Sequence, residues 1–102
     1  MNEKAIVDLT DKTMVAGVVL HGQYIFYHDY DRKARGEPCM LVYTVKNGEQ
    51  GDLVVAFHCE AVTRPKVHTA VVSVGLTAEA GVFKLTEVQF PDSTVGHRVM
   101  GE

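Results

Sequence analysis

Cysteine and histidine are the residues of this chain best suited to metal binding, disulfide formation or proton transfer. The chain contains two cysteines, Cys39 and Cys59, and five histidines. His58 directly precedes Cys59, and His28 lies just before the polar connection that leads to Cys39. Thiols can form a disulfide, bind a metal as thiolates, or stay free and buried. A disulfide and a thiolate–metal site exclude each other, because metal ligands must be deprotonated and unoxidised.

The two cysteines end two apolar segments, 39–45 and 53–59, that predict a β-hairpin. With a loop of five residues at 47–51, Cys39 faces Cys59 across the hairpin. Opposed Cβ atoms then lie roughly 4.5–5.5 Å apart, close to the reach of a disulfide. This register matches apolar residues to apolar residues, and we favour it. It predicts a Cys39–Cys59 disulfide.

A second register stays open, because Asn47-Gly48 is the strongest short hairpin signal in the chain. A two-residue turn at this dipeptide moves Cys39 opposite Ala56 and onto the face that carries His58. In the favoured register, the two thiols with His28 and His68 form an alternative metal site, with zinc or copper as the matching ions. The second register favours His58 as an alternative ligand. The candidate ligands of the metal hypothesis, in either register, are His28, Cys39, His58, Cys59 and His68. The remaining histidines, His21 and His97, are expected to be exposed or satisfied by ordinary hydrogen bonds.

Apolar residues alternate with period two along most of the chain, and helical periodicity is nearly absent. We predict an all-β protein of seven to eight strands, an antiparallel sandwich or small barrel with residues 39–59 as its central hairpin. Turns are expected at Asp11-Lys12 and His21-Gly22, and a helical turn within the polar connection 30–37. Residues 1–102 are expected to form a single domain.

The second face of the predicted hairpin is also largely apolar, although a sandwich needs only one apolar face for each sheet. Two explanations stay open. The termini or the long connection cover this face, or it is the interface of a homo-oligomer. The residues concerned are Met40, Val42, Val54, Ala56 and Val62.

Composition argues against several classes of function. The net charge of −3 gives no general attraction for nucleic acid, and no apolar run approaches the ~20 residues of a membrane span. Phosphate-binding loops, H-E-x-x-H and EF-hand patterns are missing, so we expect no enzyme. The start of the sequence shows no secretory apolar region. A disulfide would nevertheless indicate the periplasm or the extracellular space, whereas free thiols would indicate the cytoplasm.

Three segments carry a resemblance to known sequences: Leu20-His21-Gly22-Gln23-Tyr24-Ile25-Phe26-Tyr27-His28, Gly36-Glu37-Pro38-Cys39 and Phe57-His58-Cys59. Over residues 18–60 the chain resembles small bacterial β proteins thought to be exported and without an assigned activity. Those proteins often carry a Leu-Pro-x-Gly-x-Tyr turn, from which this chain departs at His21. The resemblance implies an exported β domain and supplies no catalytic residue. Because catalytic motifs are missing as well, we expect a non-enzymatic domain with a structural or binding role.

Overall fold

The structure is a computed structural model that describes residues 2–100. Eight strands and one short helix follow one another along the chain. They are β1 (Glu3–Val15), β2 (Val18–His28), α1 (Tyr30–Ala34), β3 (Met40–Lys46), β4 (Glu49–Phe57), β5 (Cys59–Thr63), β6 (Val71–Leu76), β7 (Val82–Gln89) and β8 (Val95–Val99). Among residues 2–100, no helix has the length and apolar character that crossing a bilayer requires.

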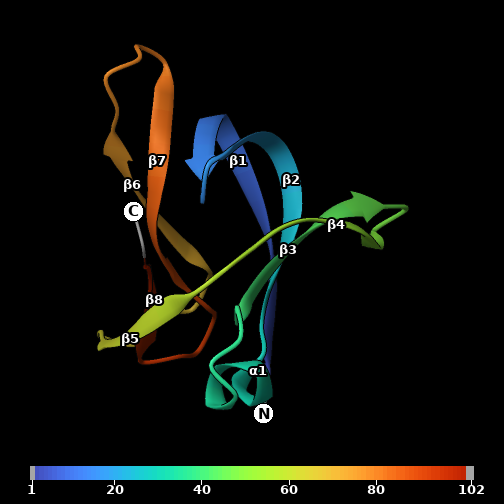
Figure 1. Cartoon of the computed structure of the whole chain (residues 1–102), viewed down its shortest axis with the longest axis vertical. Coiled ribbons are helices and arrows are strands. Elements are labelled where there is room, and N and C mark those ends of the chain that lie inside the picture. Colours follow the sequence, from blue (N-terminus) through green and yellow to red (C-terminus); the bar gives the residue numbers. More distant parts are fainter. Residues whose placement is uncertain (1, 101–102) are drawn as a thin grey trace.

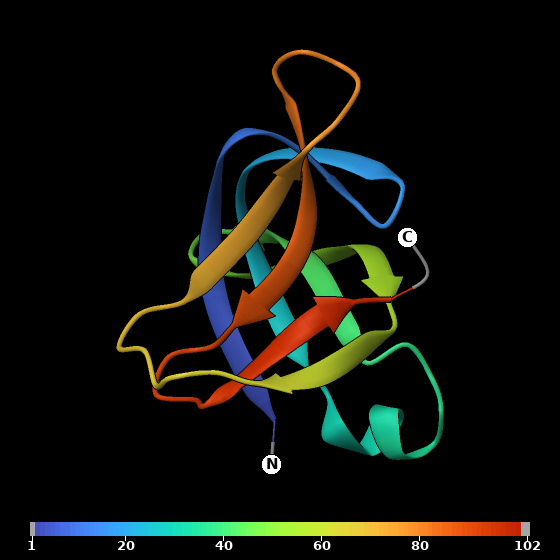
Figure 2. The same ribbon diagram turned by 90° about the vertical axis from the view of Figure 1, so that its left-hand side faces the viewer.

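The strands belong to one eight-stranded sheet. Seven of them follow the order β4-β3-β2-β1-β7-β8-β5, and β6 lies off this path and pairs with β7. Neighbouring strands are antiparallel except β1 and β7, which run parallel over a short stretch. The sheet curls into a half-barrel, so that β5–β8 lie opposite β2–β4 (Figures 1 and 2). The predicted all-β class and strand number are confirmed. The strands form one mixed sheet instead of the two antiparallel sheets of a sandwich.

The first hairpin is longer than the sequence pattern suggested. Its turn is Ala16-Gly17, with φ angles of 48° and 89°, which are typical of a tight turn between twisted strands. The turns predicted at Asp11-Lys12 and His21-Gly22 are wrong. Residues 10–12 and His21 instead lie in the register shift between the pairs Leu9–Gly22 and Thr13–Leu20. A bulge there bends both strands, which explains why polar residues interrupt the apolar pattern.

The second hairpin, β3–β4, turns at Asn47-Gly48, with φ angles of 52° and 77°. The predicted five-residue loop is therefore wrong, because local turn chemistry determines the register at the tip. Two register shifts follow along the ladder, and at its far end Met40 faces Phe57. The hairpin is also not central in the sheet, since β4 is an edge strand.

A single residue, His58, separates β4 from β5, although these strands lie at opposite ends of the sheet order. β5 pairs with β8 instead of continuing the β3–β4 ladder. The apolar segment 53–59 therefore belongs to two different strands, and the chain crosses the open side of the half-barrel between them (Figure 1).

The core fills the space between the two halves of the curled sheet. Its buried residues are Val7, Leu9, Val15, Leu20, Phe26, Met40, Val42, Phe57, Leu85, Val88, Phe90 and Val99. Two members of the predicted oligomer interface, Met40 and Val42, are completely buried in this core, and Val54 packs against it. Met40 and Val42 share this core cluster with Leu85 and Val88 of β7 and Val99 of β8. Self-association stays a prediction, but Met40 and Val42 are not available to a partner.

Candidate metal centre

Five side chains from distant parts of the sequence form two groups of possible metal ligands that share one histidine. The strand pairing brings them together: the first residue of β1 faces the last residue of β2, and the start of β5 pairs with the end of β8. The side chains are those of Glu3, His28, Cys39, Cys59 and His97.

The first group consists of His28, Cys39 and Cys59, whose ligand atoms all lie within 4.8 Å of one another. The exposed fraction is 0% for His28 and 2% for each cysteine. Two thiols and one imidazole form a donor set suited to zinc or copper(I). These three residues are among the ligands predicted from the sequence, and the fold brings them together.

The predicted Cys39–Cys59 disulfide is absent, because both cysteines are free thiols. Their Sγ atoms are 2.9 Å apart, and either thiol can donate to the other. The predicted juxtaposition is right, but its cause is different. Cys39 lies just before β3 and Cys59 begins β5, so the crossing at His58 brings the sulfur atoms together, not a ladder pair.

Burial raises the pKa of the Cys59 thiol to about 12, and the contact with Cys39 adds to the increase. The thiol therefore stays protonated at neutral pH in the metal-free protein. A metal ion that binds here must displace the proton, since only a thiolate is a good ligand.

His28 is the most unusual member of the group. Both ring nitrogens, Nδ1 and Nε2, are buried and have no hydrogen-bond partner among residues 2–100. Burial lowers the pKa of His28 to about 4, and the nearby His97 adds to the decrease, so the ring is neutral at pH 7. Buried polar atoms nearly always have partners, and an exception calls for an explanation such as an ion.

A second group shares His28 and adds Glu3 and His97, again with ligand atoms within 4.8 Å of one another. The rings of His28 and His97 stack with centroids 3.9 Å apart and planes inclined by 22°. His97 Nε2 lies 3.1 Å from Glu3 Oε1, which also accepts a hydrogen bond of 2.6 Å from Tyr30 Oη. His97 Nδ1 is buried and has no partner.

Burial and hydrogen bonding shift the pKa values of Glu3, His97 and Tyr30, and so determine their protonation states. Burial acts to raise the pKa of Glu3, but the hydrogen bonds from Tyr30 and His97 outweigh it, so the pKa lies below its usual value. Burial lowers the pKa of His97, and the Glu3 carboxylate only partly opposes this. Burial and the Glu3 carboxylate raise the pKa of Tyr30, so its hydroxyl remains a donor.

The short helix α1 holds the outer side of the centre. The Asp29 carboxylate caps it by accepting from the Asp31 and Arg32 N–H groups, at 3.0 and 3.1 Å. The Asp29 N–H donates to the Cys39 carbonyl at 2.9 Å. Lys33 Nζ donates to the Cys59 carbonyl at 2.7 Å. Backbone groups of both cysteines are therefore fixed by this predicted helical turn.

Two predicted ligands, His58 and His68, do not reach the cluster. His58 is exposed, as expected for the residue that links β4 to β5. The His68 side chain is 93% exposed and lies 3.9 Å from the carboxylate of Asp92. Both predictions failed because they assumed that the segment around Cys59 continues the second hairpin.

His97 and Glu3 were not identified from the sequence. His97 was expected to be exposed or satisfied, but it is 1% exposed and lacks a partner at Nδ1. A signal existed for His97, because it alternates with Val95 and Val99 and so shares the apolar side of its strand. Glu3 carried no such signal, since it lies in a polar start of the sequence.

No protein-family model, curated protein or solved structure matches this chain. The resemblance over residues 18–60 therefore stays a prediction. The function is inferred from the geometry of the site.

Proposed function

We propose that this protein binds one zinc ion through His28, Cys39 and Cys59. The observation that carries the proposal is the His28 ring, buried with both nitrogens unpartnered beside two thiols. A bound metal would supply a partner for one of these two nitrogens and replace the thiol protons. The free state of the cysteines favours this over the disulfide-stapled structural domain expected from the sequence.

His97 is the fourth ligand in this proposal. Zinc with two thiolates and two neutral imidazoles has no net charge, which suits a buried site. Glu3 would leave a net negative charge, and its Oε1 is already engaged by Tyr30 and His97. The His97 ring must turn to bind, because rings stacked 3.9 Å apart direct their lone pairs side by side.

The proposed role of the ion is structural or binding, not catalytic. Catalytic zinc sites keep one position open to water or substrate. Here the exposed fraction is at most 2% for each of the four ligands, His28, Cys39, Cys59 and His97. The buried donors support a closed site. They do not bear on the compartment, and export of the protein stays a prediction.

The test is a zinc titration of the reduced, metal-free protein in competition with a chromophoric chelator, with cobalt(II) as a spectroscopic probe. We expect one ion per chain and intense cobalt bands of tetrahedral geometry with thiolate charge transfer. Cys39→Ser, Cys59→Ser and His28→Ala should each weaken binding at least 100-fold. His97→Ala should also weaken zinc binding, by at least 10-fold, because it removes the fourth ligand of a tetrahedral site.

His58→Ala and His68→Ala are the matched controls, because both remove an exposed imidazole outside the cluster. They should leave zinc affinity unchanged. Equal losses in these controls would overturn the proposal, as would an intact mass two hydrogens light in the protein purified without reductant. Tight copper(I) binding that is indifferent to His97→Ala would replace zinc by copper(I) in a three-donor site.

A further inference from the structure

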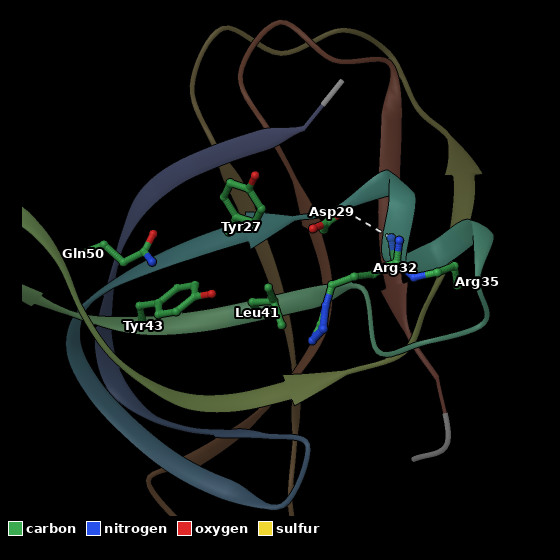
Figure 3. A pocket seen from close by; sticks show the side chains of 7 residues that line it. All are labelled: Tyr27, Asp29, Arg32, Arg35, Leu41, Tyr43 and Gln50. Carbon is green, nitrogen blue, oxygen red and sulfur yellow. Dashed lines mark hydrogen bonds between the residues drawn. The ribbon is translucent and has the colours of Figure 1, made fainter.

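The outer face of β2 and β3 carries a cavity whose lining includes none of the proposed zinc ligands. Its volume is about 500 Å³, within the range of roughly 300–1,000 Å³ for small-molecule sites. Tyr27 and Leu41 face each other across the two strands. Their neighbours Phe26 and Val42 point to the core, so the cavity lies on the opposite side of the sheet. Its lining residues are Tyr27, Asp29, Arg32, Arg35, Leu41, Tyr43 and Gln50 (Figure 3).

We propose that this cavity binds a small aromatic carboxylate, with its ring against Tyr27 and Tyr43 and its charge on Arg32. The cavity has an apolar floor at Leu41, which is 6% exposed, and two tyrosine rings from adjacent strands. Aromatic side chains prefer to pack against flat apolar groups, which favours a planar ligand.

Arg32 supplies the charge that selects an anion. Its side chain extends from α1 toward the strand that carries Leu41 (Figure 3). The Nε atom is buried without a partner, and Nη1 lies 3.6 Å from Glu37 Oε1, beyond hydrogen-bond distance. A guanidinium presents parallel donors that match the two oxygens of a carboxylate. The unpartnered Nε of Arg32 supports an anion at this position, in addition to the shape of the cavity.

The other charged groups at the cavity are already engaged. Arg35 holds Glu37 through contacts of 2.9 and 3.3 Å. The Asp29 carboxylate lines the cavity as well, but its Oδ1 accepts the two N–H groups that begin α1. Arg32 is therefore the cation that a bound anion can reach without displacing an existing hydrogen bond.

The test is a two-dimensional ¹⁵N NMR titration of the full chain with 2-naphthoate, in which the Arg32 Nε–H signal is followed directly. We expect a saturable shift of this signal and of the amides of Tyr27 and Tyr43. The neutral control, 2-naphthalenemethanol, should bind at least 10-fold more weakly. Arg32→Gln should cost 2-naphthoate at least 10-fold in affinity, and Tyr43→Ala should also weaken binding.

Arg98→Gln is the matched control, since Arg98 lies away from the cavity in a surface pair with Glu60. It should leave the affinity unchanged. Equal binding of the neutral alcohol, or an Arg32→Gln variant that binds 2-naphthoate normally, would overturn the carboxylate assignment. If inorganic phosphate binds as tightly as 2-naphthoate, the proposed contact of an aromatic ring with Tyr27 and Tyr43 is wrong. The proposal does not depend on the metal site, so the zinc ligands need not be altered.

Discussion

Gln89 and His28 are both buried polar side chains at the ends of strands, with exposed fractions of 5% and 0%. Gln89 Nε2 donates to the carbonyl groups of Pro65 and Ser93, each at 2.8 Å, and so ties two loops together. His28 has no partner at either nitrogen. The first arrangement is that of a structural hydrogen bond. The second carries an uncompensated desolvation cost, which native proteins accept mainly where a ligand binds.

The largest expected effect is that of zinc on stability. A ligand present at 100 times its dissociation constant raises the free energy of unfolding by about 2.7 kcal/mol. For a domain of this size, that corresponds to an increase in Tm of about 10–20 °C. Thermal unfolding followed by circular dichroism, with zinc and then with excess chelator, measures the shift. A Tm that is the same in both conditions would contradict a buried metal site.

Replacement of Gln89 tests the buried polar side chain that has hydrogen-bond partners. Gln89→Leu removes the donor for two carbonyl groups, and we expect the free energy of unfolding to fall by about 1–3 kcal/mol. Urea denaturation provides the measurement. Zinc affinity should stay unchanged, because Gln89 contacts Pro65 and Ser93 and not the cysteines. Loss of zinc binding in this variant would mean that the two regions are not independent.

Replacement of His28 should have the opposite sign in the metal-free protein. His28→Leu removes a buried polar ring that has no hydrogen bond to lose. We expect the metal-free variant to be as stable as the parent or more stable by about 1 kcal/mol, because a desolvated polar group disappears. Urea denaturation in the presence of chelator checks this. A loss of more than about 2 kcal/mol would show that His28 has a structural role of its own.

A surface ion pair provides the smallest effect. Arg64 holds Glu87 in a bidentate contact of 2.7 and 2.8 Å, and this lowers the pKa of Glu87 from its ordinary value of 4.5. A carboxylate with a lowered folded-state pKa stabilises the protein above pH 4.5, and this contribution disappears as the pH falls through the folded-state pKa.

Because the Arg64 side chain is 41% exposed, Glu87→Gln should cost only about 1 kcal/mol or less at pH 7. The difference from the parent protein should shrink as the pH falls through the folded-state pKa of Glu87, which lies below 4.5. Urea denaturation at a series of pH values from 7 downward measures it. A difference that grows as the pH falls would contradict the sign argued from the Arg64–Glu87 contact.

Period-two alternation predicted most strands, because each strand buries one face and exposes the other. It did not locate the turn between β1 and β2, because Ala16 adopts a positive φ. Alanine does not indicate such a conformation in the sequence. It also treated 53–59 as one strand. The break at His58 depends on pairing between β5 and β8, which is a contact between distant segments and leaves no local pattern.

The candidate site was predicted in part. His28 was predicted as a ligand together with the two cysteines, and its ring lies beside both thiols. The thiols were expected to meet, and they do. Glu3 and His97 were missed because a contact across 94 residues depends on the topology of the whole sheet. Choosing between a disulfide and free thiols required the three-dimensional surroundings of both sulfur atoms.

The contact between Glu3 and His97 joins β1 to β8, the first and last strands of the sheet in chain order. Contacts of such high sequence separation form slowly, because much loop-closure entropy must be lost before they stabilise the chain. A growing chain that has released only β1 to β5 already carries His28 and both cysteines but lacks His97. Three of the proposed ligands are thus available during translation, and the fourth arrives only when β8 has been made. The four-ligand zinc site could therefore form only after the last strand of the sheet has been made.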